Sequence, residues 1–129
     1  MEINWLAVFA AAASSFVLGG LWYSALFAKQ WQAAAGLNDA AIKSGNMGLI
    51  FGGSFVLALI ASASFAVFLG SEVDATTGAL YGFTAGLCWV AASFGINYLF
   101  ERKNLALFLI NGGYHTLQFT LIGLILGAL

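Results

Sequence analysis

Residues 105–128 read LALFLINGGYHTLQFTLIGLILGA, a run without a single charged side chain. An α-helix needs roughly 20 predominantly apolar residues to cross a bilayer, because the hydrocarbon core is about 30 Å thick and each residue rises about 1.5 Å. The run is longer than this minimum. It therefore predicts a membrane-spanning helix.

Three further runs without charge precede it, and they end at Lys29, Glu72 and Glu101. Each is long enough to span, so we expect four transmembrane helices in a single domain, residues 1–129. Because the chain contains no proline, we expect no built-in kink in any span. The expected spans are about residues 4–28, 46–70, 76–100 and 105–128.

The composition excludes a water-soluble globular domain. Hydrophobic residues make up 62% of the chain and charged residues only 7%, whereas about a quarter of the residues in a soluble domain are charged. The net charge of -1 gives no reason to expect a nucleic-acid partner. We therefore expect an all-α membrane protein whose surroundings are the lipid bilayer.

The cations that remain all lie at one end of the expected spans. They occupy the first and third connections, whereas three of the five acids flank the opposite ends. By the positive-inside rule, both basic connections face the cytoplasm and both termini face outside, in a multi-pass protein of the cytoplasmic (inner) membrane. The cations are Lys29, Lys43, Arg102 and Lys103, and the flanking acids are Glu2, Glu72 and Asp74.

The first connection predicts a short interfacial helix. Trp31 is expected at the level of the lipid headgroups, and Gly36 is expected to stop the helix. Either Asn38 or Asp39 then caps a short helix that leads into the second span. The third connection, residues 101–104, is so short that the third and fourth spans must form a tight antiparallel hairpin.

Small residues recur at every fourth position in three spans. Lipid solvates leucine as well as a neighbouring helix does, so helices in a bilayer associate through close backbone approach at small residues. We expect these stripes to be the packing seams of an antiparallel four-helix bundle, the alternative being oligomerisation faces. They comprise Ala11, Ser15 and Gly19 in the first span, Ser54, Ala58, Ser62, Ala66 and Gly70 in the second, and Gly78, Gly82 and Gly86 in the third.

A short repeat links the second and fourth spans. Residues 49–53, LIFGG, match residues 109–113, LINGG, and Leu57 aligns with Leu117. The match indicates two hairpins related by an axis along the membrane normal, unless it only reflects a chain rich in leucine, isoleucine and glycine.

Polar side chains gather in the half of the membrane next to the basic connections. Asn111, His115 and Gln118 share one face of the fourth span, at i, i+4 and i+7. At about 1.5 Å per residue, Asn111 lies roughly 10 Å into the membrane and His115 lies near the midplane. The candidate site comprises Trp22, Tyr23, Ser24, Asn97, Asn111, Tyr114, His115 and Gln118.

Three roles are open for this cluster, since an ionisable group inside a span is a functional candidate by default. His115 can be a neutral hydrogen-bonding link to Asn97 or Tyr23, part of a small-ligand or proton-handling pocket, or part of a face that docks a partner membrane protein. One imidazole does not make a metal site, and no cofactor is expected. The sequence has no catalytic motif, so we expect no enzymatic activity.

Two longer motifs resemble a known family. Residues 19–31, GGLWYSALFAKQW, and residues 97–115, NYLFERKNLALFLINGGYH, are similar to a family of small, mainly bacterial four-span membrane proteins defined only as a domain of unknown function. The two motifs contain every candidate residue except Gln118. Family members commonly have proline after Trp-Tyr-Ser, where this chain has Ala25. The resemblance implies a bacterial inner membrane location and no known activity.

These observations predict a non-enzymatic integral membrane protein. We expect either an accessory subunit or a small-ligand-binding four-helix protein, with another membrane protein or a second copy as its partner. The alternative is a small proton-coupled transporter that uses the cluster around His115.

Thiol labelling tests the expected orientation. In a Cys88→Ser background, Ala34→Cys and Lys103→Cys should react with a membrane-impermeant maleimide only after the cells are opened, because the cation distribution puts both positions inside. Labelling of either position in intact cells would contradict the orientation.

Overall fold

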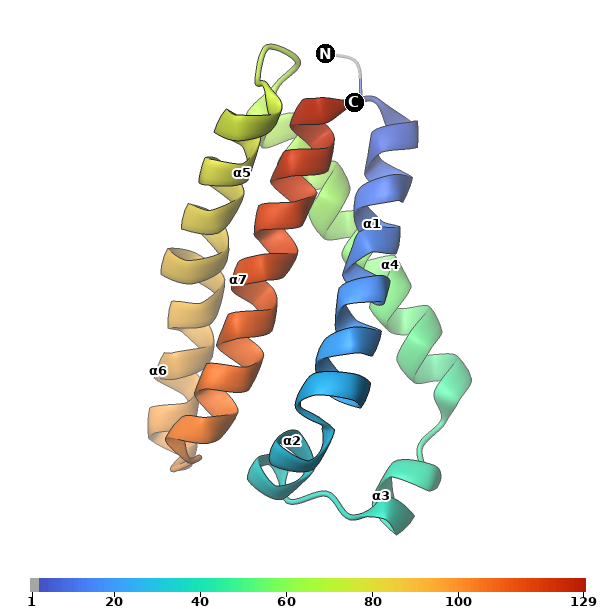
Figure 1. The fold of residues 1–129 in the computed structure, drawn as a ribbon, viewed down its shortest axis with the longest axis vertical. Helices are drawn as coiled ribbons and strands as arrows, with labels where there is room; N and C mark the ends of the chain where they lie inside the picture. Colours follow the sequence, from blue (N-terminus) through green and yellow to red (C-terminus); the bar gives the residue numbers. More distant parts are fainter. Residues whose placement is uncertain (1–2) are drawn as a thin grey trace.

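The structure is a computed structural model that describes residues 3–129, so the flanking acid Glu2 lies outside the described residues. The described chain is predominantly helical, and four helices are long and apolar enough to cross a membrane (Figure 1). The expected all-α, four-span fold class is confirmed. The observed spans are Trp5–Leu26, Met47–Leu69, Ala75–Glu101 and Leu105–Ala128.

Two of the spans contain a π-helical segment. The first span joins α1 (Trp5–Gly20) to η1 (Leu21–Leu26), and the third joins α5 (Ala75–Thr84) to η2 (Ala85–Ala91) and α6 (Ala92–Glu101). A π segment widens one turn of a helix and needs no proline. The absence of proline therefore does not make these two spans regularly α-helical throughout, although each runs as one continuous helical segment.

The first connection holds two short helices rather than one. Phe27, with φ -128°, separates η1 from α2 (Ala28–Ala35), and Gly36 ends α2 in the left-handed conformation with φ 74°. Asn38, not Asp39, caps α3 (Asp39–Lys43), because its side chain accepts a hydrogen bond from the Ala41 N–H at 2.8 Å. In the third connection, Arg102 takes the left-handed conformation with φ 59°.

Side-chain caps also begin the long helices. Each cap accepts a hydrogen bond from the backbone N–H three residues later, which satisfies one N–H group that has no partner within the helix. The Thr77 backbone N–H and hydroxyl hold the pKa of the Asp74 carboxyl below its usual value, so this cap weakens as pH falls through that lowered pKa. The caps are Asn4, Asn46, Asp74 and Asn104.

Helix α7 (Leu105–Ala128) lies in the middle of the molecule. The third span runs beside it on one side and α1 on the other, while α4 (Met47–Leu69) crosses obliquely behind (Figure 1). The C-terminus and the α4–α5 connection lie at one end, and α2, α3 and the α6–α7 turn lie at the other. We call the latter the basic end, because it carries the four cations Lys29, Lys43, Arg102 and Lys103.

Glycines bring α5 and α7 into backbone contact. A Cβ atom added to Gly78 or Gly82 would collide with the carbonyl groups of Gly123 or Phe119, and one added to Gly86 would lie 2.7 Å from the His115 carbonyl oxygen. The opposite side of α7 meets the small-residue stripe of α1, where Ala11 and Ser15 are buried and Gly19 faces the Tyr114 ring. Small residues therefore line α7 on both sides.

The stripe on α4 is buried over only part of its length. Ala58 and Ser62 are buried, but Ser54 is exposed, so the expected place in a packing seam within the bundle is wrong for Ser54. The reason is that α4 diverges from the other helices toward the basic end (Figure 1). There it meets α1 through aromatic side chains, with Phe16 at 5.4 Å from Phe55 and 6.4 Å from Phe51 between ring centroids.

Substitutions at glycine test the central seam. Gly82→Leu should lower the free energy of unfolding in mixed micelles by about 3 kcal/mol or more, since the new side chain has no room. Gly20→Leu is the matched control, because nothing lies within 4 Å of its added Cβ, and Leu80→Ala changes a side chain that is 61% exposed. Both controls should stay within about 0.5 kcal/mol of wild type. Equal losses of unfolding free energy in Gly82→Leu and Gly20→Leu would contradict the packing seam at Gly82.

Candidate functional site

A single amide joins three spans in the half of the molecule next to the basic end. Asn111 of α7 accepts a hydrogen bond from the Tyr23 hydroxyl at 2.6 Å and donates one to the Tyr98 hydroxyl at 2.7 Å. Tyr23 belongs to η1 and Tyr98 to α6. Because an amide both donates and accepts, Asn111 can serve both tyrosines at once.

A second chain of hydrogen bonds ties His115 to α1. The Gln118 side chain donates from Nε2 to the Ser15 hydroxyl at 3.3 Å, and its Oε1 lies 2.7 Å from His115 Nδ1. Since Oε1 can only accept, His115 Nδ1 is the donor in this hydrogen bond, and the proton that tells the neutral from the charged imidazole is the one on Nε2. In the neutral form, Nε2 is left as an acceptor. His115 therefore bonds to its own helix, and its link across the bundle runs through Gln118 instead of Asn97 or Tyr23.

Aromatic rings enclose the two chains. Phe94 stacks on the His115 ring with centroids 5.0 Å apart and planes 11° apart, and Tyr114 meets it edge-on at 4.9 Å. The Tyr114 hydroxyl donates to the Ser15 carbonyl oxygen at 3.0 Å. Tyr23 in turn lies 5.4 Å from Tyr114 between ring centroids. The imidazole is thus held in one orientation by a hydrogen bond and two rings.

Trp22 connects η1 to the same stretch of α7. Its indole Nε1 donates to the Ile110 carbonyl oxygen at 2.8 Å. The indole ring also covers Gly113, where an added Cβ would lie 3.1 Å from it. Together, these contacts bring residues 110–118 of α7 against both π-containing spans.

Two candidate residues do not join the cluster. Asn97 and Ser24 are exposed, and neither makes a side-chain hydrogen bond to any part of the described chain. The helical rise gave their depth, but depth does not specify which face of a helix a residue occupies. A widened turn such as η2 also rotates every residue that follows it. Tyr98, next to Asn97, takes the place that was expected for Asn97.

Three members of the cluster were missed by the sequence analysis, namely Tyr98, Phe94 and Ser15. Ser15 was assigned only to a packing stripe, yet its hydroxyl and carbonyl oxygen accept hydrogen bonds from Gln118 and Tyr114. Tyr98 lies inside the motif of residues 97–115, and a polar side chain beside Asn97 was the one signal for it.

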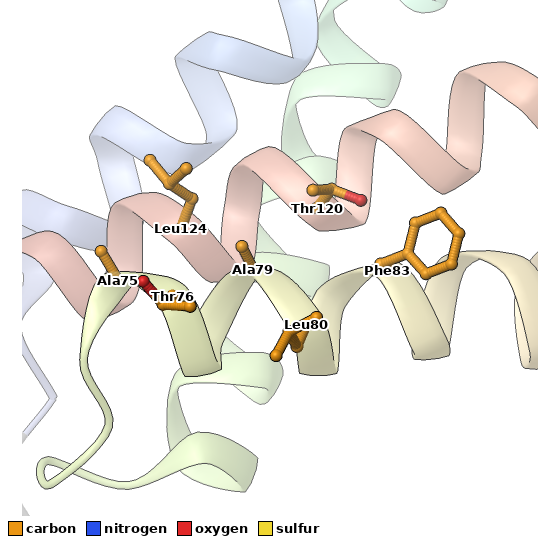
Figure 2. Close-up of a pocket in the computed structure, with 7 residues that line it drawn as sticks. All are labelled: Ala75, Thr76, Ala79, Leu80, Phe83, Thr120 and Leu124. Carbon is orange, nitrogen blue, oxygen red and sulfur yellow. The ribbon is translucent and has the colours of Figure 1, made fainter.

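Two grooves lie along the third span, and none of the side chains that make the interhelical hydrogen bonds lines either of them. One, of about 400 Å³, lies along α5 and α7, and its lining includes Ala75, Ala79 and Leu80 of α5 and Thr120 and Leu124 of α7 (Figure 2). It is open and mainly apolar. A second, of about 390 Å³, follows η2 and α6. Within residues 3–129, no three His, Cys, Asp or Glu side chains are grouped as metal ligands.

The fold and the cluster define the class of protein. It is a multi-pass α-helical membrane protein in which polar side chains of the first and third spans meet those of the central fourth span. The chain belongs to the family described as "Protein of unknown function (DUF1761)", which matches residues 6–127. Comparison with curated proteins and with solved structures gives no significant match.

The two intramembrane asparagines of the third and fourth spans provide a matched test. Asn111→Leu should lower the free energy of unfolding by roughly 1–3 kcal/mol, because it removes two interhelical hydrogen bonds and leaves two tyrosine hydroxyls without a partner. Asn97→Leu should change it by less than about 0.5 kcal/mol, since that side chain is exposed. Reversible unfolding in mixed micelles measures both. A larger loss at Asn97 would contradict the observed pairing.

Proposed function

We propose that this protein is a non-enzymatic accessory subunit that binds a transmembrane helix of another membrane protein. The binding surface is the part of α4 next to the basic end, residues 47–57, which we call the open segment. The observation that carries the proposal is that no other part of the described chain covers Gly52 and Gly53. A Cβ atom added to either would find nothing within 4 Å.

The repeat within the sequence indicates what is missing there. In α7, the matching glycines are covered: an added Cβ would lie 3.3 Å from Ala91 Cβ at Gly112 and 3.1 Å from the Trp22 ring at Gly113. The same LI-x-GG pattern in α4 has no such neighbour. Because small residues inside spans mark sites of close helix contact, a helix from another chain is the matching occupant.

The cost of these glycines supports the same conclusion. Each glycine in a helix is less favourable than alanine by about 1 kcal/mol, so glycine persists where close packing offsets that loss. The open segment contains Gly48, Gly52 and Gly53 within seven residues, and Leu49 and Leu57 beside them are 71% and 67% exposed. Contact with lipid alone would not offset the loss, whereas a closely packed helix would.

The hydrogen bonds around α7 support a structural role for the polar cluster. Asn111 and Gln118 both pair with side chains on other spans, and neither lines a groove. A ligand site would be expected to combine a concave pocket with a few convergent polar groups. The cluster therefore fits a scaffold that holds α1, α6 and α7 in place, and leaves binding to the outer surface.

Cross-linking and native mass spectrometry test the accessory role. A photoreactive amino acid at position 52 should cross-link one defined membrane protein, and the same label at position 20 should not. In native mass spectra after mild detergent extraction, Gly52→Leu should release that subunit, whereas Gly20→Leu should retain it. Neither substitution disturbs the packing within this chain, because nothing lies within 4 Å of an added Cβ at either position. A monomer or homodimer that carries only small molecules, whatever residue stands at position 52, would overturn the proposal.

A proton-coupled transporter is the second candidate, and one observation favours it. With Nδ1 donating to Gln118, His115 keeps a free acceptor at Nε2, near the middle of the span. Imidazole is the side chain that most readily changes charge near neutral pH, so such a nitrogen could take up and release a proton.

His115→Gln separates the two candidates. Glutamine retains donors and an acceptor, so a structural His115 should lose only about 0.6–2 kcal/mol of unfolding free energy on this substitution. NMR titration of labelled His115 in nanodiscs gives the second readout. No change of protonation between about pH 5 and pH 8 would exclude the transporter, whereas a titration in that range would support it.

A further inference from the structure

The groove along η2 and α6 has an apolar floor and one polar end. Trp89, Val90 and Phe94 supply the apolar surface, and Ser93 lines it with a hydroxyl that already donates to the Trp89 carbonyl oxygen at 2.6 Å. Asn97 is the remaining lining residue, and its exposed amide bonds to no other described side chain. The groove therefore offers one unused polar group, at its end nearer the basic end.

The length of the groove matches one leaflet of a bilayer. From Trp89 to Asn97 the helix rises about 12 Å, and from Trp89 to its end at Glu101 about 18 Å. Half of a hydrocarbon core is about 15 Å. The groove thus runs from the middle of the third span toward the basic end, and the last turn of α6 continues from Asn97 to Glu101. Together they cover the path of a single acyl chain.

The groups beyond Asn97 are mainly cationic donors. Arg102 and Lys103 follow α6 directly. Their backbone N–H groups donate to the carbonyl oxygens of Leu99 at 3.3 Å and Tyr98 at 2.9 Å, respectively, so their side chains are not used in these bonds. These bonds hold the turn against the end of the helix. Glu101 is the one acid in the turn, so its three charged side chains carry a net charge of +1.

We propose that this groove binds an anionic phospholipid from the leaflet at the basic end. Its acyl chain lies on Trp89 and Phe94, the Asn97 amide donates to a glycerol ester carbonyl, and Arg102 and Lys103 pair with the phosphate. Esters and phosphates are acceptors, and these three side chains all supply donors. The positive charge selects an anionic headgroup over a zwitterionic one, as it does for juxtamembrane basic residues in general.

Quenching by brominated lipids tests the proposal on the intact protein. In phosphatidylcholine nanodiscs, chain-brominated phosphatidylglycerol should quench the fluorescence of Trp89, which is the difference between the wild-type signal and that of Trp89→Phe. It should do so at a roughly fivefold lower mole fraction than chain-brominated phosphatidylcholine, the factor expected from about one net basic charge near the membrane surface. Subtracting the Trp89→Phe signal removes the other three tryptophans.

Three variants assign the preference to this groove. Arg102→Asn combined with Lys103→Gln should abolish it, and asparagine tolerates the left-handed backbone of position 102. Lys29→Gln combined with Lys43→Gln, which removes the same charge elsewhere at the basic end, should leave it intact. Asn97→Leu should weaken quenching by both lipids. Unchanged unfolding free energies confirm that each variant is folded.

Three results would overturn the proposal. Equal quenching by the two lipids would mean that the groove meets only bulk lipid. Equal loss of preference in both cation pairs would mean that the surface potential, not a site, attracts the anionic lipid. Absence of quenching by either lipid would mean that another protein chain covers the groove.

Discussion

The backbones of α5 and α7 are in direct contact at Gly78, Gly82 and Gly123. Inside a bilayer, burial of apolar side chains provides no driving force, so van der Waals contact between backbones must hold the helices together. A side chain at any of these three positions would push the helices apart. The central position of α7 depends on this seam. The contacts of Asn111 with Tyr98 and of His115 with Phe94 can form only when α7 lies close to the third span.

Two kinds of interaction hold α7. Toward α5 the contact is between backbones, whereas toward α1, η1 and α6 hydrogen bonds and aromatic rings join the helices, such as Gln118 to Ser15 and Asn111 to Tyr98. Hydrogen bonds specify one register, since each donor must meet its own acceptor. The polar cluster therefore determines where along its axis α7 sits, and glycine determines how closely it packs.

Helix α4 takes the smallest part in this arrangement, and its outer surface has a different character from that of α6. The open segment of α4 offers uncovered glycines, which suit the close approach of another helix. The groove on η2 and α6 offers aromatic rings and an amide beside two cations, which suit a lipid. Two neighbouring molecules of different chemistry can thus meet the same small protein without competing for one surface.

The sequence by itself determined the properties that depend on position along one helix. The spans, a cap at Asn38 or Asp39, and the glycine stripe of the third span all follow from uncharged length, local hydrogen bonding and the spacing of small residues. Only the tertiary structure decided that Tyr98 and not Asn97 joins the polar cluster, and that Ser54 is exposed. These outcomes depend on helix rotation and on the divergence of α4. The rotation of a helix changes at its π segment, and the divergence of α4 depends on how it packs against its neighbours. Neither can be read from the identity of residues 54, 97 or 98.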